Sequence, residues 1–211
     1  MRTGLYVQYG CGLSAPEEWL NFDASPTLRI QKLPLVGELF RKRVDFPQNI
    51  KYGNILKRLP GIEEGNCDGI YCSHVLEHLS FNDCKVAIDH TFKYLKPGGT
   101  FRCVLPDLEF LVRKYISDLD NFDSNAANQF MQSSLLGVTN REKGIKAVIN
   151  GLFSNAHHLW MWDRLSLGKL LTDAGFSSVR NCFFNDSENK QFLLVEDKSR
   201  FADALAFEAI K

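Results

Sequence analysis

One part of the sequence holds a strand, a helix and a second strand with clear boundaries between them. Residues 67–72 form an apolar run that is typical of a buried strand. We predict that the next helix begins after Ser80, whose side chain can cap it, and that its apolar stripe continues to Leu95. The sequence Pro97-Gly98-Gly99 stops the helix pattern, and residues 100–105 are typical of a second strand. This order predicts parallel strands in a layered α/β fold.

Further strands and helices are predicted on both sides of this unit. The strands are expected at residues 5–9, 19–23, 50–52, 178–184 and 204–210, and the helices near residues 28–40, within 107–162 and after Asp163. The carboxyl ends of parallel strands are where α/β sheets bind ligands, so residues at those ends are candidates for one shared site. These residues are Gly10, Cys11, Gly12, Asp23, Gly53, Asn54, Ser73, His74 and Asp107.

Length and composition narrow the classes of function. The chain has 211 residues, from which we expect a single domain over residues 1–211. Lys and Arg number 25, as do Asp and Glu, and this balance argues against nucleic acid as the main partner. The basic run Arg41-Lys42-Arg43 is more typical of a solvated loop than of a phosphate-binding patch.

The sequence also predicts where the chain is found. No apolar run approaches the ~20 residues that a membrane-spanning helix needs, and the first residues lack the apolar region of a signal peptide. The six cysteines form no C-x-x-C pair, and several lie in apolar runs. We therefore expect reduced, buried thiols and a cytoplasmic location.

The glycines after the first strand formally match a dinucleotide-binding pattern. Gly10-x-Gly12 would let the backbone come close to a ligand. An acid should lie ~20 residues beyond such glycines when the ligand is a nicotinamide cofactor, but Asp23 lies nearer than that. The crossover between the first two strands is therefore too short for a full phosphate-binding helix. Asp23 fits a carboxylate that accepts both ribose hydroxyls, and it also fits a turn or capping residue beside Ser25.

Several stretches, in this order and spacing, resemble the successive motifs of class I S-adenosylmethionine-dependent methyltransferases. The resemblance is closest to the small bacterial branch of predicted methyltransferases of type 11, and it covers nearly the whole chain. The motifs are "YVQYGCG", "WLNFDASP", "YGNI", "DGIYCSHVLEHL", "FKYLKPGGTFRCVLPDLE", "HHLWMWD" and "VEDKSRFADALAFEA".

The resemblance implies a three-layer Rossmann-like fold with a mostly parallel seven-stranded sheet of order 3-2-1-4-5-7-6, in which the last strand is antiparallel. It implies S-adenosylmethionine as the cofactor and S-adenosylhomocysteine as its product. The residues it assigns to cofactor binding are Gly10, Cys11 and Gly12 at the methionine part, Asp23 at the ribose with Ala24 beside it, Asn54 and Ile55 at the adenine, and Ser73 and His74 near the sulfonium. Relatives often carry Asp at the position of Asn54, but an amide can still contact the adenine edge.

His74-x-x-Glu77-His78 has the letter pattern of an inverted zinc-protease motif. That chemistry needs both histidines on one helical face, whereas the chain leaves a strand near Ser73 and starts its helix only after Ser80. We expect Glu77 to accept backbone N–H bonds and His78 to be a hydrogen-bonded packing residue. Some related methyltransferases bind a divalent metal here, but His74 replaces the first acid of their pattern, so we predict no metal.

The glycine motif starts at residue 10, so we expect substrate cover from within the chain, at residues 24–49 and 107–163. The second segment carries Asn155, His157, His158, Trp160 and Trp162, which suit a stacking wall for a saccharide or another polar small molecule. A packing role suits the two tryptophans equally well. For a hydroxyl acceptor the candidate bases are His158, then His157, then His74. Asp107 is a candidate for orienting the acceptor or the base.

The sequence therefore favours a methyltransferase that acts on a small molecule or a glycan, at a hydroxyl group. The alternatives are a protein that binds S-adenosylmethionine or S-adenosylhomocysteine without catalysis and, less favoured, a nicotinamide-dependent reductase. Carbon and nitrogen acceptors stay open, as does the choice between monomer and homodimer. The apolar stretch 201–210 suits either an inner strand or an interface.

Overall fold

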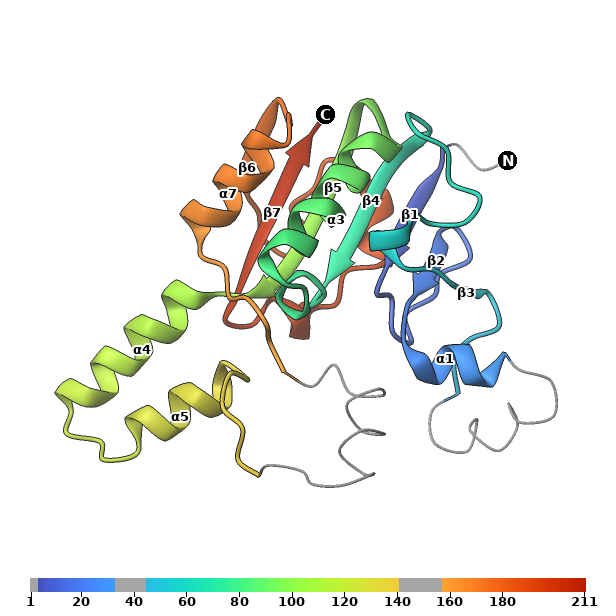
Figure 1. Ribbon diagram of the computed structural model, residues 1–211. Helices are drawn as coiled ribbons and strands as arrows, with labels where there is room; N and C mark the ends of the chain where they lie inside the picture. Colours follow the sequence, from blue (N-terminus) through green and yellow to red (C-terminus); the bar gives the residue numbers. More distant parts are fainter. Residues whose placement is uncertain (1–3, 33–44, 141–156) are drawn as a thin grey trace.

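The computed structural model describes residues 4–32, 45–140 and 157–211 and contains one seven-stranded sheet (Figure 1). Its strand order is β3-β2-β1-β4-β5-β7-β6, and β7 runs antiparallel to both of its neighbours. The predicted topology is therefore confirmed. The strands are β1 Tyr6–Tyr9, β2 Leu20–Asp23, β3 Ile50–Tyr52, β4 Cys67–Ser73, β5 Leu95–Pro106, β6 Ser178–Asn181 and β7 Ala204–Ile210.

The helices begin where the sequence places caps. Ser80 Oγ accepts a hydrogen bond from the Asp83 N–H at the start of α3, and Asp163 forms a capping box with Ser166 at the start of α7. The helices are α1 Pro26–Gln31, α3 Phe81–Tyr94, α4 Leu108–Asp120, α5 Ala126–Ser133 and α7 Arg164–Asp173, and the 3₁₀ turns are η1 Ile55–Lys57, η2 Leu76–His78, η3 Lys190–Leu194 and η4 Lys198–Phe201.

Two strand boundaries differ from the prediction by several residues, and the strand expected at residues 178–184 ends at Asn181. The strand expected at residues 100–105 already begins at Leu95, so Pro97-Gly98-Gly99 lies inside β5 rather than before it. The pairing of β4 with β5 shifts register at this place, between Cys67 and Gly69. This irregularity lets β5 continue through a Pro-Gly-Gly sequence, which normally interrupts a strand.

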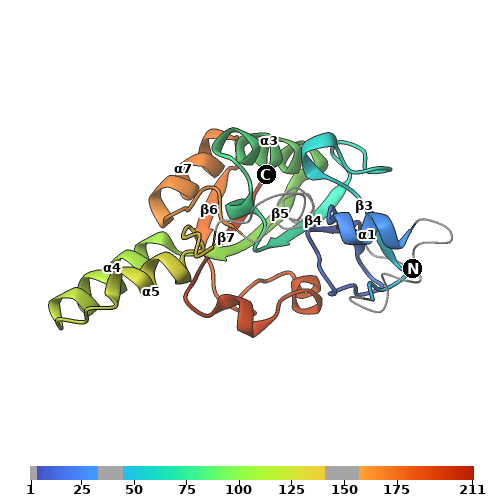
Figure 2. The same cartoon turned by 60° about the horizontal axis from the view of Figure 1, so that its bottom comes forward.

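Alternation along the central strands gives the sheet two different buried faces. Ile70 and Cys72 of β4 belong to the larger core, which α3 and α7 cover, whereas Tyr71 between them belongs to a smaller core on the opposite face. Figure 2 shows the two helices on one side of the sheet and an irregular chain segment on the other. The strands are therefore buried on both sides, as parallel strands usually are.

The second face is covered by the segment between β6 and β7, residues 182–203, which we call the C-terminal cover. Residues 10–19, which connect β1 to β2, contain no helix, as their shortness predicted. Phe192 of the cover packs edge-on against Trp19 of this connection, with ring centroids 5.5 Å apart. The open alternatives for residues 201–210 are also settled, because β7 is an inner strand between β5 and β6.

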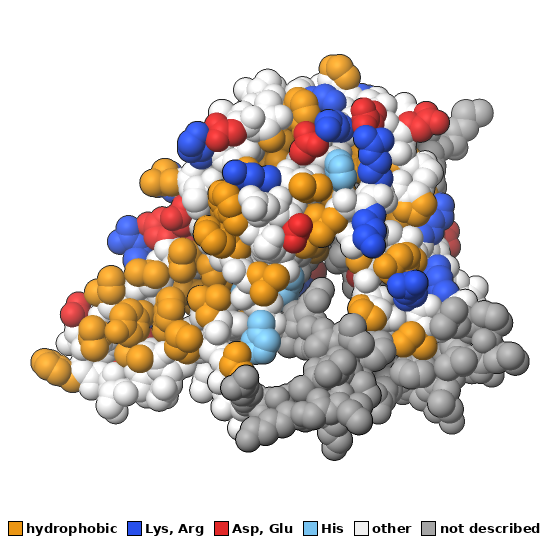
Figure 3. Space-filling view, viewed as in Figure 1, with side chains coloured by type: hydrophobic (Ala, Val, Ile, Leu, Met, Phe, Trp, Pro, Cys, Tyr) orange, Lys and Arg blue, Asp and Glu red, His pale blue; other side chains and the backbone are white. Residues whose placement is uncertain are grey.

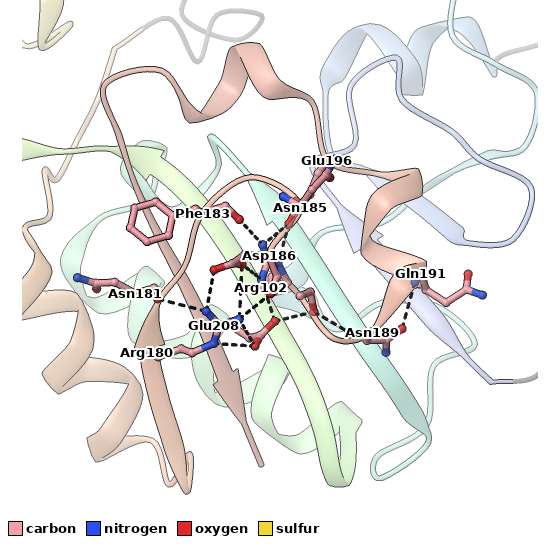
Figure 4. A network of polar contacts seen from close by, with 11 residues as sticks. Arg102, Arg180, Asn181, Phe183, Asn185, Asp186, Asn189, Gln191, Glu196 and Glu208 are labelled. Carbon is pink, nitrogen blue, oxygen red and sulfur yellow. Dashed lines mark hydrogen bonds and ion pairs between the residues drawn. The ribbon is translucent and has the colours of Figure 1, made fainter.

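A buried arginine holds the C-terminal cover to the sheet (Figure 4). Arg102 of β5 is 0% exposed and donates to Glu196, Asp186 and Glu208, at 2.6, 2.9 and 2.8 Å. Arg180, which is partly exposed, bonds the latter two carboxylates as well. We call these five residues the arginine cluster. Two guanidinium groups face three carboxylates, so each buried charge has an opposite partner.

Helices α4 and α5 form a hairpin that extends away from the sheet (Figure 1). None of the residues of α4 is buried, and Figure 3 shows apolar side chains gathered over this hairpin. The hairpin confirms the prediction of helices within residues 107–162 for the first part of that segment. Asn155 and Arg41-Lys42-Arg43 lie outside the described residues. None of the helices in the described part of the chain has the length and apolar character needed to span a bilayer.

Candidate functional site

The loop after β1 comes very close to the turn after β4. Gly10 and Gly12 have φ angles of +64° and +57°, which favour glycine. A Cβ atom added to Gly10 would overlap the Cγ2 atom of Val75. The close approach therefore joins the glycine motif to the residues that follow β4.

The Asp23 carboxylate links the ends of β1 and β2. Its two oxygens accept hydrogen bonds from the N–H groups of Gly12, at 3.0 Å, and of Ser25, at 2.7 Å. Asp23 thus has the turn role that the sequence left open. A carboxylate oxygen can accept more than one hydrogen bond, so both oxygens also keep capacity for ribose hydroxyls.

A cavity of about 440 Å³ opens beside the glycine loop. Residues 8–14, Tyr71 and Ser73 form one wall, and residues 194–197 with Arg200 form the other. The C-terminal cover thus supplies charged residues that sequence reasoning missed, although the resemblance included the stretch that contains them. Among the described residues, none forms a hydrogen bond or an ion pair with the Arg200 guanidinium, which leaves this cation available to a carboxylate ligand.

The residues assigned to adenine do not line this cavity. Asn54 Oδ1 caps η1 through the Leu56 N–H at 2.9 Å, which leaves its amide N–H groups for a ligand. Ile55 is buried in the larger core, whereas Ala24 is exposed. The Gly53 N–H bonds the Asp23 carbonyl at 3.1 Å, so the ends of β2 and β3 are adjacent.

The turn after β4 brings three histidines around one buried carboxylate. His74 has a φ of +54° and only residues 76–78 form a 3₁₀ turn, so the continuous helix of a zinc protease is absent. Glu77 is 0% exposed, and its carboxylate has no hydrogen-bond partner among the described residues. The expectation that it accepts backbone N–H bonds is therefore wrong.

The inward-facing ring nitrogens lie slightly beyond hydrogen-bond distance from this carboxylate. Glu77 Oε1 is 3.4 Å from His74 Nδ1, 3.9 Å from His78 Nε2 and 4.0 Å from His158 Nε2. We call these four side chains the His–Glu cluster. His158 comes from a distant part of the sequence, and burial, the largest influence on it, lowers the pKa of its imidazole.

Backbone hydrogen bonds join the segment 157–162 to the turn after β4. The N–H groups of Leu159 and Trp160 both donate to the Glu77 carbonyl, at 2.7 and 3.2 Å. Trp162 is 1% exposed and is a packing residue, whereas Trp160 is 44% exposed and lies against Phe81. Of these two tryptophans, only Trp160 is therefore exposed enough to contact a ligand.

The other two catalytic candidates differ in their positions. His157 is exposed next to the cluster, and its carbonyl oxygen accepts a hydrogen bond from His78 Nδ1 at 3.1 Å. Asp107 caps α4 through the Glu109 N–H at 2.8 Å and lines a separate cavity of about 720 Å³. The structure therefore brings the histidines together and leaves Asp107 apart from them.

Comparisons with known proteins agree with this geometry. A family model described as a methyltransferase domain matches residues 15–181. No curated protein sequence matches the chain. An S-adenosylmethionine-dependent methyltransferase from Archaeoglobus fulgidus is 15% identical in sequence, with a TM-score of 0.53 over 100% of this chain and 87% of its own.

A second structure gives a similar result. It is a methyltransferase from Thermotoga maritima described as a possible histamine N-methyltransferase, 16% identical, with a TM-score of 0.52 over 99% of this chain and 82% of its own. At such low identity the two structures establish the fold alone, while the family model covers most of the chain. The chain therefore belongs to the methyltransferase domain family and has the class I methyltransferase fold.

Proposed function

We propose that this methyltransferase transfers the methyl group of S-adenosylmethionine to a hydroxyl oxygen of a small polar acceptor such as a saccharide. The observation that carries the proposal is the pair of hydrogen bonds from Leu159 and Trp160 to the Glu77 carbonyl. They fix a histidine pair and an exposed indole beside the carboxyl end of β4, where Ser73 already lines the cofactor cavity.

In this proposal the cofactor lies across the ends of β1 to β4. The backbone of Gly10, Cys11 and Gly12 faces the methionine part, and Arg200 pairs with its carboxylate. Asp23 accepts the ribose hydroxyls. The adenine lies near Ala24, Asn54 and Ile55, and the sulfonium lies near Ser73 and His74. When bound, the cofactor supplies the electrophilic methyl group.

The protein then has to hold the acceptor and remove its proton. Trp160 offers an exposed ring on which a sugar can stack. His158 is the first candidate for the base and His157 the second, because both stand next to the turn after β4. We no longer favour Asp107, which lines the separate cavity and caps α4.

Ligand binding tests the cofactor half of the proposal. S-adenosylmethionine and S-adenosylhomocysteine should raise the thermal midpoint, and NADH should not, because a ligand that binds only the folded state stabilises it. Asp23→Ala should remove this shift. Asp89→Asn, an exposed carboxylate on α3 paired with Lys93, is the matched control and should keep it. An unchanged shift in Asp23→Ala contradicts the assignment of the ribose site.

Methyl transfer tests the acceptor half. Incubation with labelled S-adenosylmethionine and a panel of saccharides and phenols should transfer label to oxygen, and Trp160→Ala should raise KM more than it lowers kcat. Leu165→Ala, an exposed residue on α7, is the control. Cofactor binding without transfer to any hydroxyl in the panel would favour the non-catalytic binding protein over our proposal.

A further inference from the structure

The arrangement of hydrogen-bond donors and acceptors in the His–Glu cluster points to a cation-binding site. The outward ring nitrogen of each histidine lies within hydrogen-bond distance of a backbone carbonyl. The pairs are His74 Nε2 with Arg200 O at 3.1 Å, His78 Nδ1 with His157 O at 3.1 Å, and His158 Nδ1 with Ser134 O at 2.7 Å.

These contacts fix the tautomers. A carbonyl oxygen only accepts hydrogen bonds, so each outward nitrogen carries the proton. A neutral imidazole has one N–H, which leaves the inward nitrogens with bare lone pairs. The same arrangement, an outer N–H held by a carbonyl, orients the histidine ligands of metal ions in proteins.

Among the described residues, Glu77 then faces lone pairs and no hydrogen-bond donor. Its side chain is 1% exposed, and a buried carboxylate without a partner is costly. Either an added proton, on the carboxylate or on an imidazole, or a metal ion between the groups can satisfy it. A protonated imidazole would approach the carboxylate to about 2.7–2.9 Å. The observed separations of 3.4 to 4.0 Å are longer.

These separations suit donor atoms that share one ion. Ligands about 2.0–2.1 Å from a tetrahedral metal lie roughly 3.4 Å from one another, and the Glu77–His78 and Glu77–His158 separations of 3.9 and 4.0 Å exceed this by an amount that small inward shifts of the side chains would close. Donor atoms of Glu77, His78 and His158 all lie within 4.8 Å of one another. His74 Nδ1 is close to the Glu77 oxygen, and its side chain is 24% exposed. We propose that Glu77, His78 and His158 bind one divalent transition-metal ion of the zinc type, with an open coordination position next to His74.

The donor set determines the class of ion. Two imidazoles with one carboxylate suit Zn²⁺ and its first-row neighbours, whereas Mg²⁺ and Ca²⁺ prefer oxygen ligands. The sequence predicted no metal because His74 replaces an acid. The proposed site avoids that requirement, because its third ligand comes from the segment 157–162.

The role of the ion rests on the proposed function. A hydroxyl bound at the open position would lose its proton more easily, as metal-bound water does, and the lone pair of His74 Nδ1 next to that position would accept the proton. His158 would then be a metal ligand rather than the base. The exposed sides of His74 and His78 leave this position accessible from solvent.

Metal binding to the full chain tests the inference without any activity measurement. Untagged protein is dialysed against a chelator and then titrated with Zn²⁺, with Co²⁺ as a spectroscopic probe, and with Mg²⁺. We expect one Zn²⁺ or Co²⁺ per chain by elemental analysis, visible Co²⁺ bands of low-symmetry coordination, and no effect of Mg²⁺. His78→Ala and Glu77→Gln should weaken Co²⁺ binding by more than the about 10–100-fold that losing an outer-shell partner costs.

His157→Ala is the matched control, a neighbouring histidine outside the ligand set, and it should bind Co²⁺ like the wild type. Because Glu77→Gln alters a buried residue, circular dichroism and His78→Ala, at a partly exposed position, guard against misfolding. Absence of Co²⁺ binding to the wild type, equal binding by His78→Ala, or binding of Mg²⁺ alone would each overturn the inference. The S-adenosylmethionine thermal shift, measured on the metal-free protein, reports separately on the proposed function.

Discussion

Arg102→Met should destabilise the protein far more than the same change at Arg180. Arg102 is 0% exposed and pairs with three carboxylates, one of which, Glu196, has a side chain that is also 0% exposed. Removing one partner of a buried ion pair leaves the other charge uncompensated and costs about 3–5 kcal/mol. The side chain of Arg180 is 42% exposed, so solvent screens its pairs and the expected loss is about 1 kcal/mol.

Calorimetry and urea unfolding measure this difference. For a chain of 211 residues, 1 kcal/mol corresponds to a shift of about 2–4 °C in the midpoint. We therefore expect Arg102→Met to lower the midpoint by roughly 6–20 °C and Arg180→Met by no more than about 4 °C.

A second substitution separates lost charge pairing from lost packing. Glu196→Gln in the Arg102→Met background removes the stranded carboxylate and should recover part of the stability, which a double-mutant cycle quantifies. If the two single arginine variants lose similar free energies of unfolding, or if the double variant is less stable than Arg102→Met, the arginine cluster does not hold the cover as we argue.

Three further predictions concern local features. Gly10→Ala should reduce stability and S-adenosylmethionine binding more than Gly65→Ala does, because both have positive φ but only Gly10 lacks space for a Cβ; thermal shift measures both. Ser80→Ala should cost about 1 kcal/mol in urea unfolding through loss of the α3 cap. Burial acts to raise the pKa of Asp186 and Glu208, but hydrogen bonds, largely from the arginines, outweigh it and lower both. Their stabilisation is thus complete above about pH 4.5 and is lost as the pH falls further, which unfolding between pH 3 and 6 will show.

The sequence predicted the strands because the pattern of each strand is local, whereas the order of the strands was predicted from the family resemblance. Apolar runs and helix caps such as Ser80 and Asp163 need no knowledge of distant residues, and both predicted helix starts are confirmed. The shortness of residues 10–19 also predicted correctly that no crossover helix follows β1. These features together are sufficient to place the glycine loop next to Asp23.

The parts that were missed depend on contacts between distant segments. The C-terminal cover has only short 3₁₀ turns, which leave no periodic signal, and Arg102 looked like an ordinary strand residue. Glu77 was expected to find backbone donors, but residues 157–162 bring another histidine beside its carboxylate instead. No spacing rule in the sequence connects these two segments.

The C-terminal cover also determines when, during synthesis, the cavity beside the glycine loop can form. One wall of the cavity comes from residues 8–14 and the other from residues 194–200, near opposite ends of the sequence. During synthesis the first wall leaves the ribosome long before the second exists. A ligand of this cavity, which we propose to be S-adenosylmethionine, therefore cannot assist the early stages of folding, and a translation product that stops before residue 194 would lack one wall of the cavity. Binding in this cavity thus reports that residues 194–200 have been synthesised and folded.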